Sequence, residues 1–196
     1  TKEYLSGAIP ITNINSGLGL LLHYDNSLRL PFLSIKGQYA YHLKLSNGSL
    51  SGGFSAGILK FETTDLDIDV GVNYENEKLT AGVSFTHLNQ PSLTSWSKTK
   101  RHLFLDLCYK IPITEKLTTE PYILLNTDFA NKRIELANYI TYSDIVSIGL
   151  GWRTENALIF AAGVKIGSVK IMYAYDYDFA PIVAFRGRQT HEINLK

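Results

Sequence analysis

The chain has little of what marks several common classes of protein. Its 196 residues include a single cysteine, Cys108, which excludes an internal disulfide bond. The 19 Lys and Arg residues nearly balance the 18 Asp and Glu residues, so a net charge of +1 gives no strong field to attract nucleic acid. No apolar stretch approaches the roughly 18 residues that a membrane helix needs. A soluble protein and a membrane β-barrel, whose spans do not look hydrophobic on average, both remain possible.

Alternation of apolar and polar residues is abundant. It is clearest from Leu66 to Phe85, LDIDVGVNYENEKLTAGVSF, where only ENEK interrupts it. Side chains on a strand point to opposite faces in turn, so this stretch predicts a two-stranded ribbon with one apolar and one polar face. The apolar face could contact a protein core or lipid.

The same pattern recurs along the chain and predicts about twelve strands and no helix. The predicted strands cover residues 16–24, 33–44, 49–60, 66–75, 78–87, 101–111, 117–127, 132–141, 144–154, 157–166, 168–177 and 188–196. Most have about nine to twelve residues, the length that crosses a bilayer at the tilt of a barrel strand. Soluble strands average about five or six residues. So many long strands in succession indicate an up-and-down meander.

The predicted connections differ in length at the two ends of the strands. Short turns alternate with longer loops, apart from two short members of the long set near Asn131 and Glu155. The longer loops include DNSLRLP, FETTD, residues 88–100 and residues 178–187. Outer-membrane barrels have short periplasmic turns and long outer loops. We therefore expect residues 88–100 to be extracellular and residues 44–48 to be periplasmic.

The two faces of the predicted strands favour a barrel in lipid. Tyr and Trp gather near strand ends on the apolar face, as in interfacial belts. The polar face is rich in small residues and carries charges that could offset one another inside a barrel, and these lumen-facing residues are Lys36, Asp67, Asp69, Lys110, Arg153 and Asp176. A soluble barrel, apolar inside, is the alternative, but about twelve strands would leave its lumen too wide to fill with side chains. The sequence thus predicts an all-β fold, an antiparallel up-and-down transmembrane β-barrel of about 12–14 strands, as a single domain over residues 1–196.

The predicted number of strands is a range, 12–14, because the N-terminal segment can be interpreted in two ways. Tyr4–Thr12, YLSGAIPIT, is apolar and is joined to the first predicted strand by the short turn NIN. As a strand it is the thirteenth, and single-chain bacterial barrels have even strand numbers, so we expect a fourteenth before Thr1. Because Pro10 is awkward in a central strand, a periplasmic or plugging arm is the alternative.

Several stretches, in this order, resemble the PorP/SprF family of type IX secretion. They are GQYAYHLKL from Gly37, LSGGFSAGI from Leu50, AGVSFTHL from Ala81, SIGLGWR from Ser147, YAYDYD from Tyr173 and THEINL from Thr190. The resemblance implies an outer-membrane β-barrel of gliding and related bacteria. It also implies a role in the secretion of large surface adhesins and their retention at the cell surface. Two features depart from the family: an N-terminal Asn-Pro-Ala-type segment is not in this sequence, and the loop between Lys60 and Leu66 is short.

No set of residues predicts an enzyme. His87 and Ser84 are separated by an odd number of residues, which places them on opposite faces of a regular strand. GGFSAG at 52–57 lies mid-strand, whereas a nucleophile elbow needs a strand-to-helix turn. Asp67 and Asp69 are read as lumen charges rather than a catalytic pair, and Asp176 as a lumen or rim charge rather than a Ca²⁺ ligand. We expect no catalytic residue, no cofactor and no metal.

The sequence therefore predicts a protein that works by binding and assembly. Its expected partners are a secreted adhesin, type IX secretion components and outer-membrane lipid, with no nucleic acid. The candidate partner-binding residues are Trp96, Phe179, Ile182 and Phe185, on the two longest loops. These loops could instead fold inward and plug the barrel. The alternative function is a small-solute channel lined by Lys36, Lys110 and Arg153.

Overall fold

The structure is a computed structural model that describes residues 2–26, 30–154, 157–178 and 189–195. Strands make up nearly all of it, and the one helical turn among the described residues is the 3₁₀ helix η1 (Thr12–Ile14). The strands are β1 (Lys2–Ile11), β2 (Ser16–Asp25), β3 (Phe32–Leu45), β4 (Gly48–Lys60), β5 (Thr64–Glu75), β6 (Leu79–Thr86), β7 (His102–Tyr109), β8 (Ile111–Pro112), β9 (Leu117–Thr127), β10 (Lys132–Tyr142), β11 (Val146–Arg153), β12 (Ala157–Ile166), β13 (Val169–Asp178) and β14 (Gln189–Leu195). No helix in the described ranges is long and apolar enough to cross a membrane.

Every predicted strand is present, with ends that differ by a few residues. The strand predicted over residues 101–111 is divided into β7 and β8 at Lys110, whose backbone N–H donates to the Lys78 carbonyl at 2.6 Å. The predicted N-terminal strand is confirmed as β1, which pairs with β2 along its whole length. β1 stands at one end of the strand order, and its Pro10 pairs with Gly17 of β2. The fourteenth strand that we expect before Thr1 stays a prediction.

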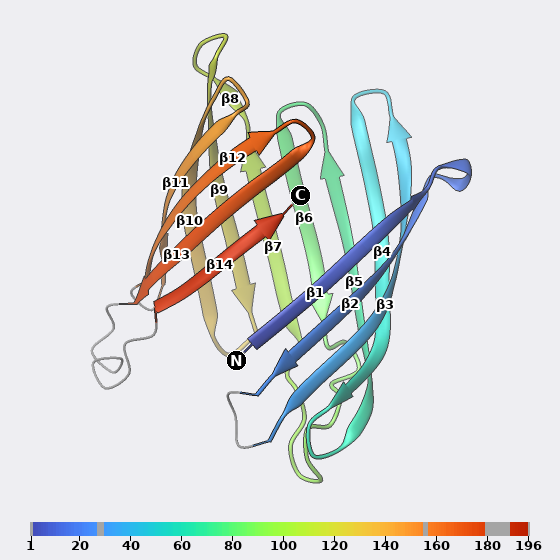
Figure 1. Ribbon diagram of the computed structural model, residues 1–196. Helices are drawn as coiled ribbons and strands as arrows, with labels where there is room; N and C mark the ends of the chain where they lie inside the picture. The colour runs from blue at the N-terminus through green and yellow to red at the C-terminus, as the bar shows by residue number, and fades with distance from the viewer. Residues whose placement is uncertain (1, 27–29, 155–156, 179–188, 196) are drawn as a thin grey trace. The chain divides into compact units, whose positions relative to one another are not determined.

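The strands follow one another in sequence order. The order in the sheet is β1-β2-β3-β4-β5-β6-β7-β9-β10-β11-β12-β13-β14, with β8 paired to β9. Figure 1 shows β1 to β5 side by side in this antiparallel succession. This is the predicted up-and-down meander. The contacts divide the chain into two units, one of residues 1–76, 81–105 and 127–131 and the other of residues 77–80, 106–126 and 132–196.

The distribution of buried residues is the reverse of that in a soluble protein. The buried apolar side chains among the described residues are Leu59, Ala157 and Ile159. The buried polar or charged residues are more numerous: Ser16, Asp25, Ser34, Lys36, Ser55, Asp67, Thr94, Thr127, Thr141 and Ser147. A soluble protein buries its large apolar side chains. The apolar face of this sheet therefore does not form a core.

The apolar face is exposed along the strands of both units. In β5, Leu66 is 51% exposed and Val72 is 52% exposed, while Asp67 between them is fully buried. In β11, Ile148 and Leu150 are each 59% exposed, while Ser147 is buried. Large exposed apolar patches mark sites of contact with a membrane or a partner. We call the opposite face, which carries Lys36 and Asp67, the polar face.

Candidate functional site

A cluster of charged side chains lies on the polar face of the first unit. Lys36 on β3 pairs across the ladder with Gly57 on β4, and Gly57 pairs with Asp67 on β5. The Lys36 ammonium reaches over β4 to the Asp67 Oδ2 at 2.7 Å and to the Asp69 Oδ2 at 2.6 Å. Glycine at position 57 leaves the path over β4 open, since it has no side chain. The cluster thus joins two strands that are not neighbours.

The remaining members of the cluster make further hydrogen bonds to the carboxylates of Asp67 and Asp69. Ser55 on β4 donates its hydroxyl to the Asp69 Oδ2 at 2.6 Å. The imidazole Nδ1 of His87 lies 2.9 Å from the Asp67 Oδ1 and 3.0 Å from its Oδ2. The Lys36 side chain is 6% exposed and that of Asp67 is fully buried, so this pairing takes place largely out of contact with water. We call Lys36, Ser55, Asp67, Asp69 and His87 the charge cluster.

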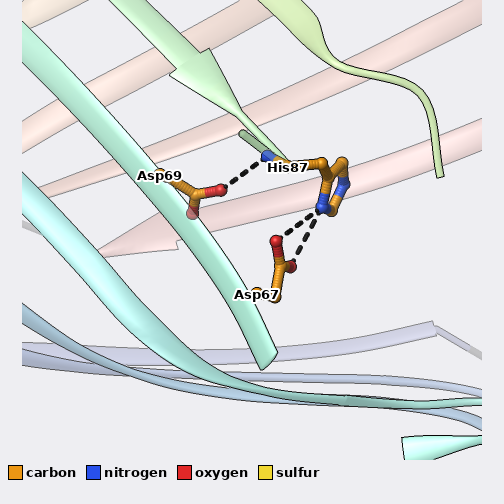
Figure 2. Close-up of side chains that lie close together, drawn as sticks. All are labelled: Asp67, Asp69 and His87. Atoms are coloured by element: carbon orange, nitrogen blue, oxygen red, sulfur yellow. Dashed lines mark hydrogen bonds and ion pairs between the residues drawn. The ribbon is translucent and has the colours of Figure 1, made fainter. Parts of the chain in front are cut away.

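His87 reaches the cluster because its backbone is unusual. β6 ends at Thr86, and His87 has a φ of 55°, in the left-handed region that costs energy for a residue other than glycine. Its backbone N–H donates to the Asp69 Oδ1 at 3.0 Å while its ring contacts Asp67 (Figure 2). The prediction from strand parity, which placed His87 on the face opposite to Ser84, is therefore wrong. Parity fails because the extended conformation ends one residue too early.

The cluster already contains its own cation. Asp67, Asp69 and His87 place three potential ligand atoms within 4.8 Å of one another. The Lys36 ammonium, however, contacts both carboxylates. A lysine in this position supplies the positive charge that two buried carboxylates need. The cluster therefore holds β3, β4, β5 and the residue after β6 together through ion pairs and hydrogen bonds.

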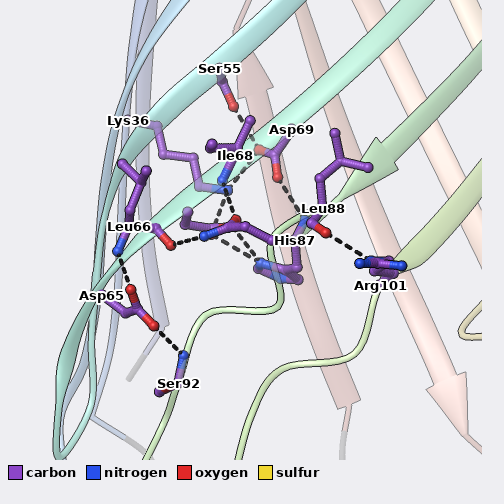
Figure 3. Close-up of polar contacts among 12 residues, drawn as sticks. Lys36, Ser55, Asp65, Leu66, Ile68, Asp69, His87, Leu88, Ser92 and Arg101 are labelled. Carbon is purple, nitrogen blue, oxygen red and sulfur yellow. Dashed lines mark hydrogen bonds and ion pairs between the residues drawn. The ribbon is translucent and has the colours of Figure 1, made fainter.

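The loop of residues 87–101 begins at the cluster and runs back along β5. Its first part continues the ladder, with the Leu88 N–H donating to the Ile68 carbonyl at 2.9 Å. The side chain of Asn89 then pairs with the backbone of β5 as a neighbouring strand would. Its Oδ1 accepts from the Ile68 N–H at 3.1 Å and its Nδ2 donates to the Leu66 carbonyl at 2.5 Å. The Ser92 N–H donates to the Asp65 Oδ2 at 2.8 Å (Figure 3).

The tip of this loop is a small folded hairpin. The Leu93 N–H donates to the Ser97 carbonyl at 2.8 Å, and Ser92 and Lys98 form an isolated β-bridge. Pro91 and Thr94 are buried, whereas Trp96 is 78% exposed. The structure therefore places Trp96, predicted to bind a partner, on the surface.

A neighbouring turn, which strand alternation does not reveal as a site, supports the same loop. The Lys100 ammonium lies 2.6 Å from the Asp128 Oδ2. Asp128 also accepts from the N–H groups of Ala130 and Asn131, and Phe129 beside it is 65% exposed. The hydrogen bond from Lys100 and those from the turn backbone hold the pKa of Asp128 well below its ordinary value of 3.8. The motif TDFAN, with an Asp two and three residues before the N–H groups that it accepts from, is the signal that could have revealed this turn.

Two other residues predicted to face the lumen, Arg153 and Asp176, belong to a second charge group. Arg153 and Asp176 are brought together in the second unit, where Arg153 donates to Asp176 at 2.8 Å and to Glu135 at 2.9 Å. The members of this second charge group come from three strands, since Arg153 lies on β11, Asp176 on β13 and Glu135 on β10. Lys110 joins neither group and lies 3.9 Å from Asp144 of the 143–145 turn. The predicted residues Phe179, Ile182 and Phe185 lie outside the described residues.

Comparison with known proteins decides the family. The model of the family described as type IX secretion system membrane protein PorP/SprF matches residues 1–66 and 59–196. The chain belongs to the PorP/SprF family. A search of curated proteins finds no match. PorP/SprF proteins are membrane proteins of the type IX secretion system and lie in the outer membrane, which confirms the predicted family and location.

The two matched stretches of this PorP/SprF protein overlap at residues 59–66. The overlap includes the 61–63 connection between β4 and β5. It is also the place where the 87–101 loop docks, because the N–H groups of Glu62 and Thr63 both donate to the Leu93 carbonyl, at 3.1 and 3.2 Å.

Proposed function

We propose that this PorP/SprF protein is a closed barrel in the outer membrane that binds type IX partners through the 87–101 loop. The observation that carries the proposal is a rigidly held loop that presents an exposed tryptophan. A preordered loop loses little conformational entropy on binding, and exposed tryptophans are frequent anchors of protein interfaces. The partner surface would be Trp96, together with Phe129 on the turn that Lys100 contacts.

Lipid is the proposed partner of the apolar face. The exposed aliphatic side chains of β5 and β11 suit hydrocarbon, while the charge cluster on the polar face is paired and shielded. Closure into a barrel would remove the unpaired strand edges that a bilayer does not tolerate.

Within type IX secretion we propose a role in the secretion and surface retention of a large adhesin, and so in gliding motility, by binding and assembly rather than by catalysis. Two features support binding over chemistry. His87 is engaged by two carboxylates through its ring and backbone, and Lys36 is engaged by the same carboxylates. The charges and hydrogen-bonding groups of His87, Lys36 and the two carboxylates are paired with one another, which suits a structural anchor.

The test is partner capture from the native outer membrane. A tagged Trp96→Ala protein should recover its type IX partners about tenfold or more less efficiently than the parent, the loss expected for an interface anchor. Ser95→Ala, at the exposed neighbouring position, is the matched control and should have little effect. If Trp96→Ala captures partners as well as Ser95→Ala does, the loop is not the binding surface.

A small-solute channel is the second candidate, and the pairing of the polar-face charges counts against it. A selectivity lining uses charges that are available to the permeating ion. Here Lys36 and Arg153 are each engaged by two carboxylates, and Lys110 lies near Asp144. Recording from the purified protein in a planar bilayer separates the candidates, because a stable open conductance supports the channel.

A further inference from the structure

The polar face of the second unit carries two lysines side by side. Lys165 on β12 and Lys170 on β13 are directly opposite each other in the ladder, beside the 167–168 turn. Residues opposite each other in an antiparallel pair have Cβ atoms about 5 Å apart, and like charges in such a pair destabilise the sheet. Neither ammonium forms an ion pair with any acid in the part of the chain that the structure describes. A bound anion would therefore relieve the repulsion between the two lysines.

This lysine pair differs from the other cations of the polar face. Lys36 and Arg153 each contact two carboxylates, and Lys110 lies near Asp144. Lys170 is half-buried, and it has no such partner among the described residues. Removing a charge from water costs free energy unless an opposite charge or a hydrogen-bond partner compensates it. The position of Lys170 thus favours an anionic ligand.

Lys170 lines one end of a cavity of about 330 Å³ within the second unit. Met172 and Ala174 follow it on the same face of β13. Asn194 on β14 is opposite Met172, and Ala161 on β12 is opposite Ala174. Sites for small ligands, of about 300–1,000 Å³, combine an apolar lining with a few polar groups that fix the orientation of the ligand. The small apolar side chains beside the Lys170 ammonium and the Asn194 amide have this character.

An aromatic ring and a group of acids complete the lining. Tyr139 on β10 lines the cavity, and its ring lies over Gly149 of β11, where an added Cβ would be 2.5 Å from the Tyr139 Cδ1. The other end holds Arg153 with its two carboxylate partners, Glu135 and Asp176. One cation and two carboxylates leave a net negative charge there. An anion in the cavity is therefore attracted to the lysine end and repelled from the other end.

We propose that this cavity binds a carboxylate that is joined to an apolar group. The carboxylate lies against the Lys170 ammonium and the Asn194 amide, where it also reduces the repulsion from Lys165. The apolar group lies over Ala161 and beside the ring of Tyr139. Two sources have this chemistry: a free small acid, and a protein segment in which an acidic side chain neighbours an apolar one. The site is additional to the proposed partner surface and does not depend on it.

Saturation-transfer nuclear magnetic resonance measures binding to the full chain in detergent micelles, with empty micelles as the blank. The probes are isocaproate and the peptide acetyl-Gly-Glu-Leu-Gly-amide, and their neutral matches are isocaproamide and acetyl-Gly-Gln-Leu-Gly-amide. At least one acid should bind about tenfold more tightly than its neutral match, the factor expected for a hydrogen bond to a charged group. The acid that binds more tightly identifies the source. If neither acid binds more tightly than its neutral match, the proposal is overturned.

A lysine variant tests the charged end of the cavity. Lys170→Gln should lower the affinity for the acid about tenfold, because it removes the ammonium. Lys116→Gln is the matched control, since Lys116 is an exposed lysine that does not line the cavity, and it should keep the affinity of the parent. Inorganic phosphate, which has no apolar group, should not displace the acid at equal concentration. Equal losses in the two variants, or displacement by phosphate, would mean a general attraction of anions and would contradict the proposal.

A second pair of variants tests the apolar middle. Ala161→Leu places a larger side chain in the cavity and should abolish measurable binding of the acid. Ala162→Leu is the matched control, since Ala162 is the next residue of β12 and is exposed on the opposite face. Ala174→Leu, directly opposite Ala161 on β13, tests the same space independently. Circular dichroism checks that each variant keeps its β-sheet. If folded Ala161→Leu or Ala174→Leu binds the acid as tightly as Ala162→Leu does, the acid does not occupy this cavity and the proposal is wrong.

Discussion

Gly57 is the residue that allows the charge cluster to form. It lies on β4 between Lys36 and Asp67, and a Cβ added there would overlap the carbonyl oxygen of Ile35 and lie 2.6 Å from the Lys36 Cα. Both atoms are backbone and cannot rotate away. Gly52, five positions earlier on the same strand, has no atom within 4 Å of such a Cβ.

These two glycines give a matched test of the packing. Gly57→Ala should lower the free energy of unfolding by about 1–3 kcal/mol, the usual cost of forcing an extra group into a packed site. Gly52→Ala should change it by much less. Urea unfolding in lipid vesicles, followed by the loss of β-sheet circular dichroism, measures both. Equal stability of the two variants would mean that β3 and β4 do not approach each other as described.

Val70 tests the assignment of the faces. It lies near the middle of β5 on the apolar face and is 38% exposed. Val70→Arg should lower the free energy of unfolding in lipid by about 2–4 kcal/mol, the cost of a charge at the midplane of a lipid-facing strand. Val70→Leu, which keeps the position apolar, is the control and should have little effect. If arginine is tolerated as well as leucine, lipid does not contact this face.

Strand parity predicted which face each residue of the charge cluster occupies, except for His87. It placed Lys36, Asp67 and Asp69 together on the polar face, where the structure has them. It did not predict their contact, because that depends on the register of three strands. The two-residue turn at Ser46 and Asn47 fixes one register, but the 61–63 connection has no turn type that the sequence reveals. The left-handed φ of His87 has no sequence signal either, since it depends on carboxylates from another strand.

At the scale of elements, the strands could be predicted and the conformation of the loop could not. Alternation with period two extends through nearly every strand, so their existence follows from local sequence. The 87–101 loop has no such pattern. Its conformation depends on tertiary contacts, above all on the Asn89 side chain, which takes the place of a backbone peptide beside β5. An asparagine in a loop gives no indication of which backbone groups it will bind.

The 128–131 turn should lose order in acid. The pKa of Asp128 is lowered in the folded protein, so its carboxylate stabilises the turn at pH values above the ordinary value of 3.8, and this contribution is lost as the pH falls below that value toward the folded pKa. Asp128→Asn keeps an oxygen that can accept from Ala130 and Asn131 but removes the ion pair with Lys100. Hydrogen exchange of the turn, corrected for its intrinsic pH dependence, should rise in acid for the parent and not for this variant.

The control for the acid response is Asp144→Asn. Asp144 is 70% exposed and lies 3.9 Å from Lys110, too far for a strong ion pair. This variant should show the same acid-induced rise in exchange at residues 128–131 as the parent does. A parent turn whose exchange is independent of pH below about 4 would contradict the account of the Asp128 carboxylate.

For the whole molecule, the topology predicts which parts of the chain lie on the same side of the membrane. Antiparallel succession places the 46–47 turn and the 76–78 turn at one end of the strands, and the 61–63 connection and the 87–101 loop at the other. The hydrogen bonds between residues 62–63 and Leu93 agree with this assignment. The long-loop end of outer-membrane barrels faces the exterior. We therefore predict that the 87–101 loop is extracellular and that the 46–47 turn is periplasmic.

Cysteine labelling of intact cells tests this orientation at two exposed positions. Ser95→Cys on the loop and Asn47→Cys on the turn are each placed in a Cys108→Ser background, so that one thiol is present. A membrane-impermeant maleimide should label position 95 in intact cells and position 47 only after the outer membrane is opened. Both should label in opened cells, which controls for the reactivity of each site. Labelling of position 47 but not of position 95 in intact cells would reverse the orientation, and it would place Trp96 in the periplasm, where a surface adhesin could contact it only during export.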